Sequence, residues 1–167
     1  MTAAPAVQGQ ILDPFEAFAG VLPRHGALAG LDFGSKTIGV AISDSLRTVA
    51  TPRETVRRKK FSSDSERLMA LFSGASVTGI VLGLPRNMDG SEGPRCQSTR
   101  AFARNLAAVL ALPIGFWDER LSTVAAERAL LEADTSRARR AEVIDHVAAS
   151  YILLGALDRL RHLGDQL

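Results

Sequence analysis

Apolar residues along the chain fall into two kinds of pattern. Short apolar runs rich in Val, Ile and Leu are typical of buried strands, whereas apolar residues that repeat every three or four positions are typical of helices. Strands are predicted at residues 27–32, 37–43, 48–56, 77–84 and 114–117. Helices are predicted at residues 62–73, 97–110, 122–132 and 139–160, with Ser62 or Ser63 capping the first of them.

The order of these elements predicts an α/β fold. Three strands in succession indicate an antiparallel start, and the later strands alternate with helices, as they do in parallel crossovers. Written as β-β-β-α-β-α-β-α, the order predicts a mixed five-stranded sheet with helices on both faces. Pro52 lacks an amide hydrogen, so the third strand is expected at an edge of the sheet or with an interruption.

The beginning of the chain differs from the rest. Its first residues are mostly Ala, Pro and Gln, so residues 1–26 are predicted to form an N-terminal leader that is partly flexible. Within this leader, residues 11–22 are expected to form a short helix that packs Phe15 and Phe18 onto the body. The domain proper is predicted to span residues 27–167.

Composition narrows the class of protein without indicating a function. The 167 residues are 46% hydrophobic and 23% charged, as in an ordinary folded domain. The one cysteine, Cys96, cannot form an intramolecular disulfide, and no apolar run is long enough to span a bilayer. A cytoplasmic protein without a membrane anchor is therefore expected. The net charge is only +2, but two basic clusters, at residues 57–60 and 137–140, could contact phosphate groups.

Acidic side chains stand where an α/β sheet collects its ligands, at the carboxyl ends of strands. Asp32 ends the first predicted strand, and Asp118 and Glu119 follow the last one. Asp145 precedes an apolar stripe in the last helix, where an unpaired carboxylate would be costly to bury. Three carboxylates without His or Cys ligands suit Mg²⁺, with Mn²⁺ as the alternative. Two such ions would support cleavage of a phosphodiester by a metal-activated water.

Four segments of the chain resemble the motifs of one family. Residues 31–44, with the sequence LDFGSKTIGVAISD, resemble the opening motif of the YqgF (RuvX) family. Residues 83–94, 118–127 and 145–149 resemble its second, third and fourth motifs, in the family's order. The four motifs together are far more specific than any one of them, and they span nearly the whole chain outside the leader.

The resemblance implies a ribonuclease H-like fold and a metal-dependent nuclease of the bacterial cytoplasm. It also implies a role in ribosome biogenesis, namely maturing the 5′ end of pre-16S ribosomal RNA. By motif match, Asp32, Glu119 and Asp145 would be the three catalytic and metal-binding acids, the same residues that the strand ends and the last helix indicate. Thr37 departs from the pattern, because many relatives carry a basic residue there, and Lys36 is left as the only cation of the turn.

Further residues of these motifs are expected to contact the substrate. Lys36 would hold a phosphate near Asp32, and Arg120 would orient the Glu119 carboxylate or contact the scissile phosphate. The loop after the fourth predicted strand is expected to act as a substrate lid. Its polar candidates are Asn87, Asp89, Ser91 and Glu92.

The sequence leaves alternative functions open. The leading hypothesis is a nuclease acting on structured pre-rRNA, as a monomer or a homodimer. The alternative is a Holliday-junction resolvase acting on branched DNA, whose symmetric cutting would need a dimer. A further alternative is a nucleotide- or nucleic-acid-binding module without catalysis, because the turn at residues 32–35 also resembles the first phosphate loop of actin-like and sugar-kinase ATPases.

Overall fold

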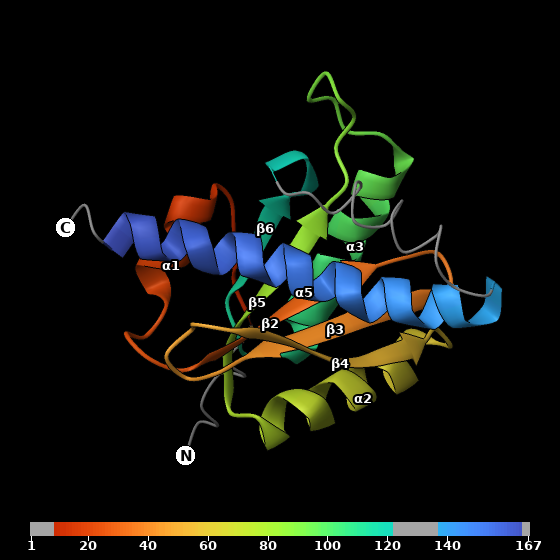
Figure 1. The fold of residues 1–167 in the computed structure, drawn as a ribbon, viewed down its shortest axis with the longest axis horizontal. Helices are drawn as coiled ribbons and strands as arrows, with labels where there is room; N and C mark the ends of the chain where they lie inside the picture. Colours follow the sequence, from red (N-terminus) through yellow and green to blue (C-terminus); the bar gives the residue numbers. More distant parts are fainter. Residues whose placement is uncertain (1–8, 122–136, 165–167) are drawn as a thin grey trace, which may run out of the picture.

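The computed structural model describes residues 9–121 and 137–164, with side chains described for residues 9–121 and 146–164 (Figure 1). The strands are β1 (Ile11–Leu12), β2 (Ala27–Phe33), β3 (Thr37–Ser43), β4 (Ala50–Arg57), β5 (Val77–Leu84) and β6 (Ile114–Asp118). The helices are α1 (Phe15–Val21), α2 (Phe61–Gly74), α3 (Pro94–Val109), the 3₁₀ helix η1 (Glu119–Leu121) and α5 (Arg137–Gly164). The helix expected at residues 122–132 lies outside the described residues. In the part of the chain that is described, no helix is long and apolar enough to cross a membrane.

The strands form one mixed sheet in the order β1-β6-β5-β2-β3-β4. The first four of these run parallel, and β3 is antiparallel to both of its neighbours. β4 lies at an edge, as Pro52 predicts, and its pairing with β3 passes over Arg53 next to that proline. The hairpin start and the parallel crossovers therefore agree with the predicted order of elements.

Helices cover both faces of the sheet, as predicted (Figure 1). α5 lies across one face, where its Ile152 shares a core with Leu28 of β2. α2 and α3 cover the opposite face, where Leu68 and Leu106 share a core with Leu82 of β5. Because both faces are covered, the central strands are apolar on both sides, which explains their continuous apolar runs.

The structure corrects two predictions. The sheet has six strands instead of five, because residues 11 and 12 form β1 and do not begin a helix. β1 pairs in parallel with β6, and the amide of Ile114 donates to the carbonyl of Gln10 at 2.7 Å.

The predicted cap at Ser62 or Ser63 is also wrong, because α2 begins earlier, at Phe61. There the carboxylate of Asp64 accepts a hydrogen bond from the amide of Lys59, at 3.0 Å, and stabilises the entry to the helix.

The N-terminal segment packs onto the core of the sheet. Phe18 is fully buried, and its ring lies so close to Gly115 that a Cβ there would come within 2.5 Å of it. The ring centre of Phe15 lies 5.6 Å from that of Trp117. The expected packing of Phe15 and Phe18 onto the body is therefore confirmed, whereas the division between residues 1–26 and 27–167 stays a prediction.

Phe18→Ala tests how much this segment stabilises the fold. The substitution is expected to lower the free energy of unfolding by about 3–5 kcal/mol, because it leaves a cavity between α1 and the sheet. Val21→Ala, in the same helix, is the matched control, since Val21 is 47% exposed. It is expected to change the free energy by less than about 0.5 kcal/mol. Urea unfolding measures both, and equal effects would contradict the role of Phe18 in the core.

Candidate functional site

Asp32 lies at the carboxyl end of β2, on the face of the sheet that α5 covers. Alternate residues of a strand point to the same face, and Gly30, two positions earlier, lies against Leu153 of α5. The Asp32 side chain is only 5% exposed. A carboxylate buried to this extent is stabilised only by polar groups or by opposite charge, so its surroundings matter for its chemistry.

Glu119, the first residue of η1, reaches the same face from the end of β6. Its Oε1 lies 2.7 Å from the position that a Cβ on Gly83 of β5 would take. Gly83 follows Leu82, which pairs with Leu31 of β2, so Gly83 lies beside Asp32. The structure thus places the Asp32 and Glu119 side chains over neighbouring strands, on one face of the sheet.

Asp118, the other acid at the end of β6, is paired with Arg120. The Arg120 guanidinium donates to the Asp118 carboxylate through Nη2 at 2.7 Å and through Nε at 3.1 Å. The hydrogen bond from the Arg120 side chain lowers the pKa of Asp118. Asp118 therefore stays ionised and fixes the guanidinium at the edge of the sheet. That Arg120 orients Glu119 or contacts a phosphate stays a prediction.

Asp145 belongs to α5, and its side chain lies outside the described residues. Its neighbour His146 is described, and the His146 Nδ1 lies 2.9 Å from the Oγ1 of Thr55 in β4. Thr55 pairs with Gly39 of β3, and Gly39 pairs with Asp32 of β2. This turn of α5 therefore crosses the sheet at the level of Asp32.

The convergence of the three predicted acids stays a prediction. Among the side chains that the structure describes, no group of three or more His, Cys, Asp and Glu residues is placed to hold a metal ion. Two of the predicted acids are described and share one face, and the third is described only as a position in α5.

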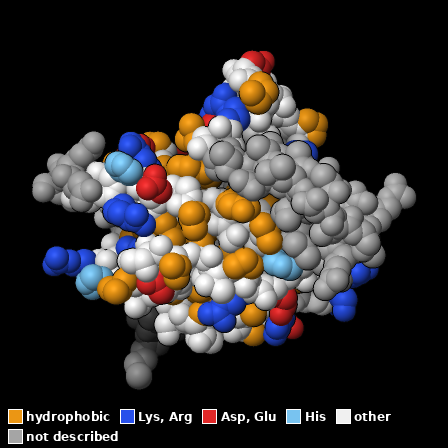
Figure 2. Space-filling view, viewed as in Figure 1, with side chains coloured by type: hydrophobic (Ala, Val, Ile, Leu, Met, Phe, Trp, Pro, Cys, Tyr) orange, Lys and Arg blue, Asp and Glu red, His pale blue; other side chains and the backbone are white. Residues whose placement is uncertain are grey.

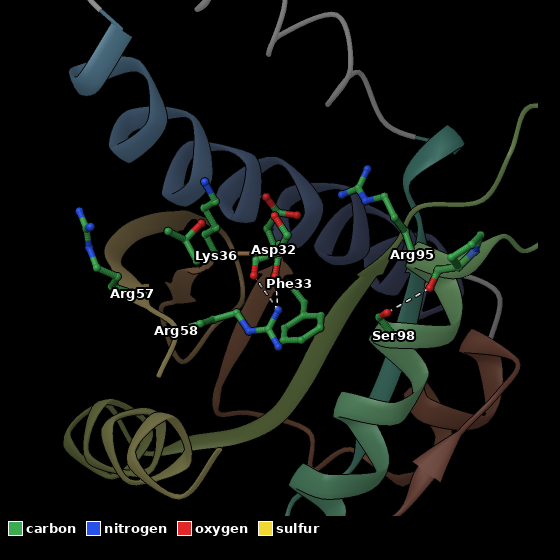
Figure 3. A pocket seen from close by; sticks show the side chains of 11 residues that line it. Asp32, Phe33, Lys36, Arg57, Arg58, Arg95 and Ser98 are labelled. Carbon is green, nitrogen blue, oxygen red and sulfur yellow. Dashed lines mark hydrogen bonds between the residues drawn. The ribbon is translucent and has the colours of Figure 1, made fainter. Parts of the chain in front are cut away.

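A pocket of about 740 Å³ opens beside Asp32 at the carboxyl edge of the sheet (Figure 3). Its walls are the β2–β3 turn, the end of β4 and the first turns of α3. The basic side chains that line it are Lys36, Arg57, Arg58 and Arg95. Figure 3 shows Lys36, Arg57 and Arg58 to one side of Asp32 and Arg95 to the other. The pocket therefore combines a buried carboxylate with several cations, a distribution of charge that favours an anionic ligand.

Arg58 holds the turn that carries Lys36. Its Nη1 donates to the carbonyl oxygen of Gly34 at 2.8 Å. Its guanidinium carbon lies 4.3 Å from the centre of the Phe33 ring, which in turn stacks on Phe102 with ring centres 4.2 Å apart. The sequence marks Arg58 only as a member of a basic cluster, and its role in shaping the turn appears only in the structure.

Arg95 was not among the predicted site residues. The sequence places it in a loop, because the third helix was predicted to begin at residue 97, whereas α3 begins at Pro94. Proline at the first position of a helix is common, since its missing amide hydrogen would have no partner there. Pro94 was therefore the signal that could have placed Arg95 on the helix, facing the pocket.

The loop between β5 and α3, residues 85–93, uses its polar side chains for internal contacts. The amide nitrogen of the Asn87 side chain donates to the Ser91 hydroxyl at 3.0 Å, and that hydroxyl donates to Asp89 at 2.6 Å. The second bond lowers the pKa of Asp89. At the base of the loop, Arg100 donates to both oxygens of Glu92 at 2.6 and 2.7 Å and lowers the pKa of that carboxyl. These contacts brace the loop, and substrate contact by the same side chains stays a prediction.

Comparison with known proteins decides the family. A family model described as RuvX, Holliday junction resolvase, matches residues 26–159 of the chain. The chain belongs to the RuvX family. A RuvX relative from Ruegeria sp. (strain TM1040), named "Putative pre-16S rRNA nuclease", is 75% identical over 153 residues, which are 92% of this chain and 98% of the relative. The relative of the same name from Paracoccus denitrificans (strain Pd 1222) is 68% identical over 154 residues, with 92% and 98% covered.

A solved structure supports the fold of this RuvX protein. The structure described as T. thermophilus RuvC in complex with Holliday junction substrate matches with a TM-score of 0.51. The match covers 84% of this chain and 96% of that chain, at 12% sequence identity. Identity this low shows the fold alone. The ribonuclease H-like fold that the four motifs imply is therefore confirmed, with one strand more than predicted.

Arg58→Lys tests how the turn of this RuvX protein is held. A lysine ammonium cannot stack as a plane on Phe33 while bonding the backbone, so the turn is expected to open more often. The amide of Gly34 donates to the carbonyl of Thr37 at 2.9 Å and reports on this opening. Its hydrogen exchange is expected to be about tenfold faster, the equivalent of about 1.4 kcal/mol. Arg57→Lys is the control, and the same exchange rate in both variants would contradict the role of Arg58.

Proposed function

We propose that this protein is a metal-dependent endonuclease that hydrolyses phosphodiesters in structured RNA, and that it processes the 5′ end of pre-16S ribosomal RNA. The observation that carries the proposal is the placement of Asp32 and Glu119 over neighbouring strands, on one face of the sheet and beside a basic pocket. The names of relatives about 70% identical to this chain support the choice of substrate. A cytoplasmic location fits such a substrate.

The chemistry of the acids fits Mg²⁺ or Mn²⁺. Carboxylate oxygens are the hard ligands that these cations prefer. Asp32 is buried and Glu119 half-buried, so a bound cation would offset negative charge that water solvates poorly there. Asp145 is the predicted third ligand, from the turn of α5 that crosses the sheet at the level of Asp32. When bound, divalent ions supply an activated water and stabilise the leaving oxygen of a phosphodiester.

The basic residues of the pocket would hold the nucleic-acid backbone. Lys36 and Arg57 on one side of Asp32, and Arg95 on the other, would pair with phosphates that flank the scissile one. Arg58 would act indirectly, by keeping the turn of Lys36 in place. Contacts of this kind position a substrate without reading its bases, so they fit an RNA that is recognised by its shape.

The description of the family favours Holliday-junction resolution as a second candidate function. The same acids would serve, but symmetric cutting of a four-way junction requires two active sites and hence a dimer. A cleavage assay that offers a labelled pre-rRNA leader and a four-way DNA junction side by side separates the two functions. Preferred cutting of the junction by a protein that sediments as a dimer would replace the first proposal with the second.

Asp32→Asn tests the proposed catalytic site. The change removes a negative charge but keeps the shape of the side chain, so it is expected to abolish Mg²⁺-dependent cleavage and to weaken Mn²⁺ binding in calorimetry. Asp158→Asn is the matched control, because the Asp158 side chain is 65% exposed and lies in a distant part of α5. This substitution is expected to leave both cleavage and Mn²⁺ binding unchanged. Thermal unfolding checks that both variants fold. Cleavage by Asp32→Asn at the wild-type rate would contradict the proposal.

Gly83→Ala tests the position of Glu119 without changing any acid. The added methyl group would lie 2.7 Å from Glu119 Oε1 and 2.4 Å from Ile152 Cδ1. Both atoms end rotatable side chains, so the fold is expected to persist while the carboxylate moves. A shift of this size is expected to lower the rate of cleavage at saturating substrate by about tenfold or more.

Gly74→Ala is the control for this variant, because nothing lies within 4 Å of a Cβ at that position. It is expected to cleave at the wild-type rate. A Gly83→Ala protein that folds and cleaves as fast as the control would show that the placement of Glu119 does not matter for the reaction.

A further inference from the structure

Met88 stands at the tip of the loop between β5 and α3. It is 90% exposed, more than any other large apolar side chain among those described as exposed. The loop projects from the body of the molecule beyond the carboxyl ends of β5 and β6 (Figure 1). Figure 2 shows apolar and charged side chains together on this projection. Covering such an exposed, large apolar side chain with a partner is favourable, because it removes apolar surface from water.

The loop that carries Met88 is held in one shape. The amide of Asn87 donates to the carbonyl of Ser91, and the amide of Gly90 donates to the carbonyl of Asn87, both at 2.9 Å. Arg120 Nη1 donates to the carbonyl of Met88 itself at 3.3 Å. Gly90 has a φ of +90°, which a residue with a side chain rarely adopts, and this conformation lets the loop turn back sharply. The tip is thus braced from within and from η1.

The polar side chains of the loop contact one another or its base, and they leave Met88 as the apolar group presented outward. Asn87, Asp89 and Ser91 bond among themselves, and Glu92 is paired with Arg100. The same contacts explain why a loop rich in polar residues keeps its shape without a regular backbone.

The position of the tip, next to the proposed catalytic acid Glu119, favours nucleic acid as the partner. The Arg120 guanidinium donates to the carbonyl oxygen of Met88, and Arg120 follows Glu119 directly in η1. The tip of the loop is therefore held by the same short segment that carries the proposed catalytic acid. Arg86, at the base of the loop, is paired with Glu92, and Arg120 is paired with Asp118, so both arginines brace the tip. Nucleic-acid-binding proteins insert apolar side chains, methionine among them, as wedges between stacked bases.

We propose that Met88 inserts between stacked bases of the substrate, beside the phosphate that is cut. The inserted side chain would unstack one base step at the boundary of a paired region and so set where the backbone enters the site. Met88 then selects the cleavage position, whereas the basic pocket holds the phosphates. This inference rests on the proposed nuclease function, because it needs a nucleic acid bound at the acids.

The experiment uses the full chain and a pre-rRNA leader hairpin that carries 2-aminopurine, a base whose fluorescence rises when it is unstacked. The labelled base is placed in turn at each position around the cut that the wild-type protein makes. Binding and fluorescence are measured in the Asp32→Asn background, which the proposed function expects to bind without cutting. Cleavage is measured with the wild-type acids.

Met88→Ala and Met88→Gln are expected to abolish the rise in fluorescence, to weaken binding about tenfold and to scatter the cleavage positions. Met88→Phe is expected to keep all three properties, because a flat apolar ring also fits between bases. Because Met88 is so exposed, none of these changes is expected to alter thermal stability.

Leu46→Ala is the matched control. Leu46 is 67% exposed and follows β3, in the turn whose Ser45 carbonyl accepts from Gly26, at the opposite end of the sheet from the acids. Wild-type protein that neither binds nor cuts the RNA would overturn the proposed function itself. If the wild type binds and cuts but Met88→Ala behaves like Leu46→Ala, the nuclease stands and the wedge is wrong, including the case in which the tip docks a protein instead.

Discussion

The close seating of α5 on the sheet determines the geometry of the site. The helix approaches β2 so closely that a Cβ on Gly30 would lie 2.6 Å from Leu153 Cβ and 2.9 Å from the carbonyl oxygen of Ala149. Only glycine permits this approach. Because α5 packs so closely on the sheet, its N-terminal half lies over the strand ends that carry Asp32 and Glu119. The catalytic proposal depends on this contact more than on any single ion pair.

The central part of the fold could be predicted from the sequence because its signals are local. Strands buried on both faces are apolar along their whole length, so β2 and β5 were found close to their true ends. β1 could not be found in this way. Two residues carry no periodicity, and its partner β6 lies about a hundred positions further along the chain, so only the folded sheet defines this strand. The start of α2 was missed because its N-cap, Lys60, makes no side-chain capping bond and so leaves no capping signal in the sequence.

The site was predictable to the extent that its residues stand at strand ends. Asp32 and Glu119 were indicated in this way, and the structure places both on one face. Which acid after β6 faces the site could not be derived from the adjacent pair Asp118 and Glu119 alone, because the pairing of Asp118 with Arg120 depends on side-chain geometry. The role of Arg58 depends on a stack with Phe33, which local sequence patterns do not encode.

The two outer strands also bear on self-association. β1 is only two residues long, and the eight-residue β4 is interrupted by Pro52 and a skipped residue, so neither border of the sheet offers a long uninterrupted row of backbone groups. Borders of this kind resist edge-to-edge pairing between molecules. Continuation of the sheet by a second copy of the chain is therefore disfavoured. A two-fold assembly is expected to join through helices or loops, where its geometry would set the spacing between two active sites.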